Sequence, residues 1–130
     1  MELIKTYFLT LGVFLGIDSV WLLSMNKNFY GKYLGHLMAD KPNLLIALAF
    51  YLINVVGMMV LVINPALKDS SWNKLLIGAM VYGLCTYATY DMTNMATLKN
   101  WPTIVTIVDM IWGVTLTTVV SSVVFYLLRK

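Results

Sequence analysis

Three aspartates lie inside long apolar stretches of this 130-residue chain: Asp18, Asp91 and Asp109. A carboxylate at membrane depth is costly unless it is paired, protonated or facing a wet cavity, so such residues indicate a functional site by default. If the three lie together, they cannot all ionise, and at least one is expected to carry a proton. That chemistry suits a proton-coupled carrier, a cation site or a general acid.

A count of residues predicts that the three carboxylates share one depth. Asp18 is seven residues before the end of the first apolar stretch. Asp91 is eight residues before Lys99, and Asp109 is eight residues after Trp101. At the rise of an α-helix, each carboxylate then lies about 10–12 Å from the same membrane face. Facing inward, they would form one polar layer.

The residues around Asp91 favour an inward-facing polar surface. Tyr87, Asp91 and Asn94 have the spacing i, i+4, i+7, which places them on one face of a helix. Tyr90 and Thr93 lie beside them. A run this polar is unsuited to lipid contact on all sides, so we expect these residues to shape the site.

Asp18 and Asp109 share the pattern Asp-x-x-Trp, which places Trp21 and Trp112 next to them. An indole N–H is a hydrogen-bond donor that adds no charge. A purely structural role is the alternative, in which Asp18 bonds Trp112 and Asp109 bonds Trp21 or Tyr87 across helices.

Two cationic candidates complete the predicted site. Lys99 could neutralise the carboxylates, and His36 could join them if its segment folds over the layer. A cationic substrate or a divalent metal held by oxygen ligands is also open. The single histidine excludes a haem or zinc centre with two histidines from one chain, and the single cysteine, Cys85, excludes a Cys-based zinc site.

Composition places the chain in a membrane. It is 60% hydrophobic and only 12% charged, with a mean hydropathy of +0.79, whereas soluble domains have about a quarter of their residues charged. We therefore expect one integral membrane domain covering residues 1–130, with membrane lipid as its partner. The net charge of +3 comes without a basic stripe, which argues against nucleic acid.

Four stretches are long enough to cross a bilayer as helices, which requires about 20 residues. Pro65 is expected to close the second span, and Trp101-Pro102 to open the fourth. Short connections make neighbouring helices antiparallel, so the predicted fold is an all-α, up-down four-helix bundle. The expected spans are residues 3–25, 43–64, 75–97 and 102–128.

The connection at residues 27–41 is predicted to be an amphipathic helix at the membrane interface. An interfacial loop with aromatic anchors is the alternative. Apolar residues at helical spacing alternate there with the polar residues Lys27, Lys32, His36, Asp40 and Lys41. Five basic residues on the side of the two termini against four on the other side favour termini in the cytoplasm.

Gly12 and Gly16 form a Gly-x-x-x-Gly pair that permits close helix contact. At about 100° per residue, this face lies opposite Asp18. If Asp18 points inward, the glycines point outward and indicate a homodimer. The alternative is packing within the monomer against Ala79 and Gly83.

Several motifs together resemble one family of small bacterial membrane proteins, domain-of-unknown-function family 2177. They are YATYDMTNMATLKNWP at residues 87–102, VDMIWG at 108–113, DSVW at 18–21, and FY at 29–30 with LGHL at 34–37. The resemblance covers essentially the whole chain. It implies a multi-pass protein of the bacterial inner membrane with four helices, and it implies no activity.

Three functions fit these observations. The first is a module that binds or transports a cation, a proton or an amphiphilic small molecule through the carboxylate layer. The second is an enzyme acting on a lipid or isoprenoid head group, with Asp91 or Asp109 as general acid or base or as a ligand of Mg²⁺. The third is a structural or assembly factor.

Overall fold

The computed structural model describes residues 2–39 and 41–129, and these residues form helices joined by short connections, with no strand among them. Asp40, which falls in the predicted interfacial helix, and Lys130, which counts toward the basic side of the termini, lie outside the described residues. The elements are α1 (Glu2–Met25), the π-helical turn η1 (Asn26–Tyr30), α2 (Gly31–Leu34), α3 (Leu44–Met58), the π-helical turn η2 (Met59–Ile63), α4 (Asn64–Asp69), α5 (Trp72–Thr97) and α6 (Thr103–Leu128).

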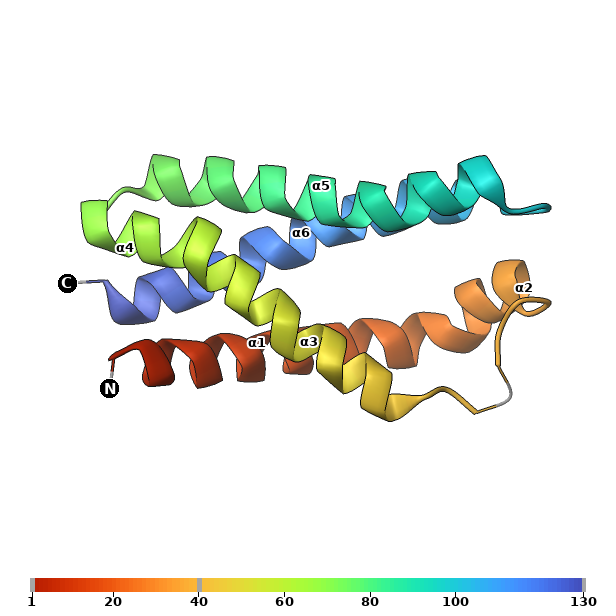
Figure 1. The fold of residues 1–130 in the computed structure, drawn as a ribbon, viewed down its shortest axis with the longest axis horizontal. Helices are drawn as coiled ribbons and strands as arrows, with labels where there is room; N and C mark the ends of the chain where they lie inside the picture. The colour runs from red at the N-terminus through yellow and green to blue at the C-terminus, as the bar shows by residue number, and fades with distance from the viewer. Residues whose placement is uncertain (1, 40, 130) are drawn as a thin grey trace.

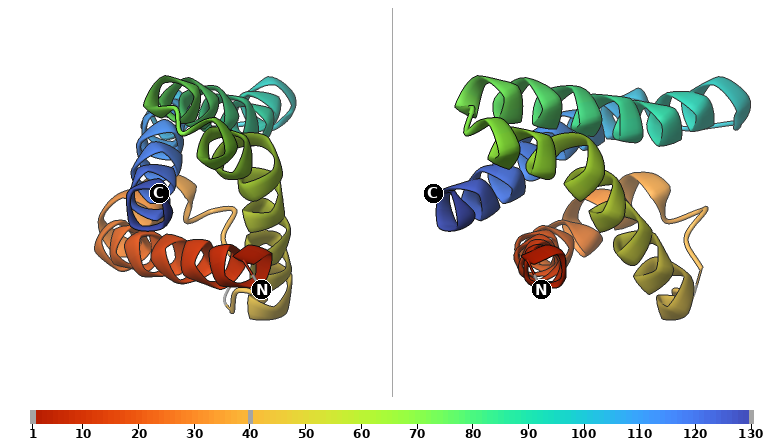
Figure 2. Two further views of the ribbon diagram at one scale, coloured as in Figure 1. Left: turned by 90° about the vertical axis from the view of Figure 1, so that its left-hand side faces the viewer. Right: turned by 60° about the vertical axis from the view of Figure 1, so that its left-hand side comes forward.

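The long helices run alternately in opposite directions along the molecule (Figure 1). The start of α1, α4 and the end of α6 lie at one end, which we call the terminal end. Helix α2 and the turn between α5 and α6 lie at the other end. Helices α5 and α6 pack closely together, whereas α3 crosses the other helices obliquely (Figures 1 and 2).

Three helical segments are long and apolar enough to cross a membrane: Glu2–Leu34, Leu44–Asp69 and Thr103–Leu128. Their outer surfaces are strongly apolar, as at Leu23, which is 85% exposed. Helix α5 also has 26 residues, but it carries the polar run at residues 86–94. A span at residues 75–97 therefore stays a prediction.

The segment after the first helix differs from the predicted separate helix at residues 27–41. The backbone of α1 continues without a break through η1 and α2 as far as Leu34. No proline or glycine lies between Met25 and Gly31 to end the helix, and the backbone passes through one π turn at Asn26–Tyr30. Residues 35–39 and 41–43 are turns and irregular chain.

Pro65 does not end the second helical segment, contrary to the prediction. The helical backbone passes through Pro65 and ends at Asp69. A proline ring clashes with the carbonyl four residues earlier, which here belongs to Leu61. Leu61 lies in η2, where the π turn widens the hydrogen-bond ladder. Ser71 then starts α5 earlier than predicted, because its side chain accepts a hydrogen bond from the Lys74 N–H at 3.1 Å.

Small residues allow α5 and α6 to meet closely. A Cβ added at Gly83 would lie 2.6 Å from the Gly113 carbonyl oxygen, and one added at Gly113 would overlap the Tyr87 ring. The glycines of α1 behave differently, since Gly12 and Gly16 have no other heavy atom within 4 Å of such a Cβ. Packing of these two residues against Ala79 and Gly83 within the monomer is therefore wrong.

The core lies between α3–α4, α5 and α6, with Phe14 of α1 completing it. Its buried apolar side chains hold the terminal end together, whereas Asp18 of α1 and Asp109 of α6 lie nearer the opposite end. The members are Phe14, Met58, Val62, Ile63, Ala66, Leu75, Ala79, Leu116, Val120, Val124 and Phe125.

Candidate functional site

A cavity of about 510 Å³ lies toward the α2 end of the molecule, and we call it the acidic pocket. Residues from every long helix and from η1 and α2 contribute to it. Two of its lining side chains are carboxylates and seven are aromatic. The lining residues are Asp18, Trp21, Leu22, Asn26, Tyr30, Leu34, Met38, Phe50, Tyr51, Thr86, Tyr87, Tyr90, Asp109 and Trp112.

Asp18 of α1 receives hydrogen bonds from two other helices. The Tyr51 hydroxyl of α3 donates to it at 2.7 Å, and the Trp112 indole N–H of α6 donates at 3.2 Å. The side chain is only 7% exposed. Both donors are neutral, so they stabilise the carboxylate without cancelling its charge.

Asp109 of α6 is 8% exposed and accepts a hydrogen bond from the Tyr30 hydroxyl. That hydroxyl in turn accepts a bond from the Trp21 indole N–H at 3.0 Å. Tyr30 lies on η1, so the unbroken helical path after α1 is what brings its ring back against α6. Asp109 is thereby connected to Trp21 of α1 through the uncharged hydroxyl of Tyr30.

The two tryptophans stack face to face between α1 and α6. The ring centroids of Trp21 and Trp112 are 4.2 Å apart, and the ring planes differ by 7°. Each indole serves the carboxylate of the opposite helix, because Trp112 bonds Asp18 directly and Trp21 reaches Asp109 through Tyr30. The two Asp-x-x-Trp motifs therefore interact reciprocally, with the indole of each motif directed to the aspartate of the other.

Asp91 of α5 is fully buried beside the acidic pocket rather than in its lining. Among the described residues, no donor group reaches either of its carboxyl oxygens. Its neighbour is the Asp109 carboxyl. Two buried carboxyl groups that lie side by side do not readily both carry a negative charge, and we call these two residues the Asp91–Asp109 pair.

A polar chain secures the backbone at Asp91. The Trp101 indole N–H donates to the Thr106 hydroxyl at 2.9 Å, and that hydroxyl donates to the Asp91 carbonyl at 3.3 Å. The start of α6 is therefore tied to the polar run of α5 at residues 86–94. This tie holds the two members of the Asp91–Asp109 pair at the same level.

Comparison with known proteins gives the class of this chain. Residues 3–126 match a family described as "Predicted membrane protein (DUF2177)". The chain belongs to the DUF2177 family. It is a membrane protein, and the resemblance seen in the sequence motifs is confirmed. No curated protein and no solved structure matches it.

The fold of this DUF2177 protein brings most of the predicted site residues into one region, but not all of them. Six line the acidic pocket: Asp18, Trp21, Tyr87, Tyr90, Asp109 and Trp112. Asp91 adjoins it through Asp109. Asn94, Thr93, His36 and Lys99 do not line it, and the last three are exposed. His36 lies beyond the end of α2 and Lys99 beyond the end of α5, where solvent and lipid head groups can solvate a charge.

Several lining residues of this DUF2177 protein were missed by the sequence analysis. Tyr30 and Tyr51 matter most, since they are the hydroxyl donors to Asp109 and Asp18. That both are tyrosines could have indicated their role, because carboxylates buried in an apolar segment require uncharged hydrogen-bond donors. Their positions in the sequence gave no such indication, because Tyr51 lies in a span with no acidic residue near it. The others missed are Leu22, Asn26, Leu34, Met38, Phe50 and Thr86.

The described side chains of this region do not form a metal site with three or more acidic, histidine or cysteine ligands. Residues 2–39 and 41–129 contain no group of three or more His, Cys, Asp or Glu placed to hold one. The groups facing Asp18 and Asp109 are tyrosine hydroxyls and indole N–H groups, which donate hydrogen bonds and leave few oxygens for a cation with six ligands. The predicted option of a metal held by all three aspartates is therefore wrong.

Proposed function

We propose that this protein binds an amphiphilic organic cation in the acidic pocket and releases a proton from the Asp91–Asp109 pair as it does so. One observation carries the proposal: two buried carboxylates line an aromatic cavity of about 510 Å³ and receive hydrogen bonds only from neutral donors. A charged group in such surroundings lacks the compensation that buried charges require.

The lining supports an organic rather than a small inorganic cation. Most of the lining surface is apolar and aromatic, including the stacked pair Trp21–Trp112 and the rings of Tyr87 and Tyr90. A desolvated cation gains about 2 kcal/mol from an aromatic face, in addition to its attraction to Asp18 and Asp109. An ammonium or phosphonium with apolar substituents matches both features.

The Asp91–Asp109 pair is the proposed source of the proton that is released when the cation binds. Without a cation, a proton shared by Asp91 and Asp109 limits the negative charge buried in the membrane. A cation beside Asp109 replaces that proton electrostatically, so the net charge of the site stays the same. Binding should consequently tighten as pH rises, by up to about tenfold per pH unit when one proton is displaced.

The test is calorimetric titration of the detergent-purified full chain with tetraphenylphosphonium, and with tetraphenylborate as an anion of the same shape. We expect the cation alone to bind. Asp109→Asn should weaken binding by about 2–5 kcal/mol, which is at least thirtyfold, because a buried charge partner is lost. Glu2→Gln is the matched control, since Glu2 is an exposed carboxylate outside the pocket.

Equal binding of the cation and the anion would contradict the proposal, as would equal losses in Asp109→Asn and Glu2→Gln. A protein that binds neither probe and keeps its cellular role after Asp18→Asn and Asp109→Asn would support the structural alternative. In that case the bonds of Tyr51, Trp112 and Tyr30 to the aspartates serve only to join helices. Turnover of a lipid dependent on Asp109 would support the enzyme alternative.

We also propose a homodimer in the bacterial inner membrane, with both termini in the cytoplasm. The exposed face of α1 around Gly12 and Gly16 is open in the monomer, which supports close approach of a second copy. Transport, as opposed to binding, would require such a dimer because one chain is small for a translocation path. Gly16→Ile should convert a dimer to a monomer in native mass spectra while leaving cation binding by each chain intact.

A further inference from the structure

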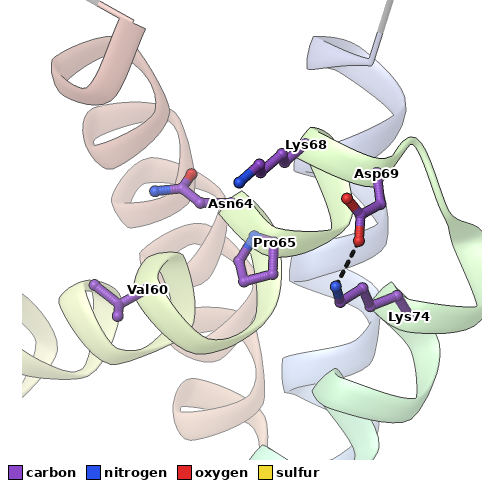
Figure 3. Close-up of a pocket in the computed structure, with 6 residues that line it drawn as sticks. All are labelled: Val60, Asn64, Pro65, Lys68, Asp69 and Lys74. Carbon is purple, nitrogen blue, oxygen red and sulfur yellow. Dashed lines mark hydrogen bonds and ion pairs between the residues drawn. The ribbon is translucent and has the colours of Figure 1, made fainter.

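A second cavity, of about 500 Å³, lies at the terminal end around the connection between α4 and α5 (Figure 3). We call it the basic pocket. It is separate from the acidic pocket, because the two share no lining residue. Its lining residues are Val60, Asn64, Pro65, Lys68, Asp69 and Lys74.

The two lysines of the basic pocket differ in their partners. The Lys74 ammonium is paired with Asp69 at 2.5 Å. Lys68 forms no ion pair with any described residue, and its side chain extends toward Asn64, away from the Asp69–Lys74 pair (Figure 3). An unpaired ammonium next to a side-chain amide offers several N–H donors to an anionic oxygen.

An apolar surface leads directly into the basic pocket. Val56, Val60 and Leu61 are 50%, 60% and 65% exposed along the outer face of α3 and η2. The pocket itself lies at the end of the apolar segment Leu44–Asp69. This order, apolar wall first and ammonium at the end, is the order of acyl chain and phosphate in a phospholipid leaflet.

The charge of the terminal end favours an anionic head group. The described residues there include the basic side chains of Lys5, Lys68, Lys74 and Arg129, against the acidic side chains of Glu2 and Asp69. Juxtamembrane basic residues are attracted to the anionic lipids of the cytoplasmic leaflet. A zwitterionic head group would bring its own ammonium close to this positive surface.

We infer that the basic pocket binds an anionic phospholipid, whose phosphate contacts Lys68 and Asn64 while an acyl chain lies along Val56 and Val60. The lipid then belongs to the leaflet on the side of the termini. Because the two pockets lie in different parts of the chain, this inference does not depend on cation binding.

The experiment is native mass spectrometry of the detergent-purified full chain, titrated separately with phosphatidylglycerol and phosphatidylcholine. We expect preferential binding of phosphatidylglycerol. Lys68→Gln should weaken it about fivefold, the effect of one basic residue near an anionic membrane surface. Lys27→Gln is the matched control, since it removes an exposed lysine outside the pocket.

A third variant tests the role of the neighbouring ion pair. Asp69→Asn removes the competing carboxylate and frees Lys74, so phosphatidylglycerol should bind more tightly. Equal binding of the two lipids, or equal losses in Lys68→Gln and Lys27→Gln, would overturn the inference. Competition by millimolar inorganic phosphate as strong as that by the lipid would also overturn it, because the site would then recognise free phosphate.

Failure here is distinguishable from failure of the proposed function. Lys68→Gln should leave tetraphenylphosphonium binding unchanged, because Lys68 does not line the acidic pocket. Its exposed position also means that the variant should unfold at the wild-type temperature. A loss of lipid with intact cation binding therefore reports on the basic pocket alone.

Discussion

Tyr30→Phe should be among the most damaging small changes to this protein, because one hydroxyl makes two polar contacts there. The Tyr30 hydroxyl donates to Asp109 and accepts from the Trp21 indole at 3.0 Å. The substitution keeps the ring, which packs on Phe29 with centroids 5.2 Å apart. Apart from its neighbour Asp91, the Asp109 carboxylate has no other side-chain partner among the described residues.

Tyr51→Phe provides a matched comparison. It also removes one hydroxyl donor, at 2.7 Å from Asp18. However, Asp18 keeps its bond from Trp112, so no buried partner is left without a bond. A bond to a charged group contributes about 1.5–3 kcal/mol in water-soluble proteins, and interhelical bonds in membranes average about 0.6 kcal/mol. We expect a loss near 1 kcal/mol for Tyr51→Phe.

The loss for Tyr30→Phe should be about 3 kcal/mol. It includes the bond to Asp109 and the cost of leaving the Trp21 N–H unpaired, about 1–3 kcal/mol. The assay is unfolding in mixed micelles of increasing SDS fraction, followed by circular dichroism. Equal losses in the two variants, or a larger loss in Tyr51→Phe, would refute the reasoning from the hydrogen-bond pattern.

Three further predictions follow from single contacts. Asp91→Asn should abolish the pH dependence of tetraphenylphosphonium binding, since an amide donates permanently to the neighbouring carboxylate; a slope like that of the wild type would contradict the shared proton. Gly113→Ala should destabilise by about 1–3 kcal/mol because its Cβ meets the Tyr87 ring, whereas Gly12→Ala should be neutral or slightly stabilising in the same SDS titration. Ser71→Ala should cost about 1 kcal/mol through loss of the α5 cap, and an unchanged midpoint would show that the cap contributes nothing.

The helices followed largely from local sequence, because hydropathy and chain length act along one segment at a time. The described ends of the third and fourth long helices lie within three residues of the predicted limits. The errors arose where packing or backbone adjustment overrode a local signal. Pro65 is a strong helix breaker by itself, yet a π turn before it lets the helix continue.

A shared level of the three carboxylates along the helices was also predictable from the sequence, since a helix advances by a constant rise per residue. Asp18, Asp91 and Asp109 are buried in neighbouring parts of the structure, and their distance from a membrane face stays a prediction. Whether they act in binding stays a prediction. Asn94 shows the limit of spacing alone, because it shares a helical face with Asp91 and still does not line the pocket.

Only the tertiary structure decided which side chains meet these carboxylates. Tyr30 and Tyr51 are 79 and 33 residues from the aspartates they contact, and no local pattern encodes such separations. They depend on the path of the chain after α1, the oblique crossing of α3, and the rotation of each helix about its axis. Composition determined that this protein lies in a membrane, and the position of the aspartates within apolar segments indicated that they are buried. Helix packing decided which of these aspartates share a pocket, because packing sets the direction in which each side chain points.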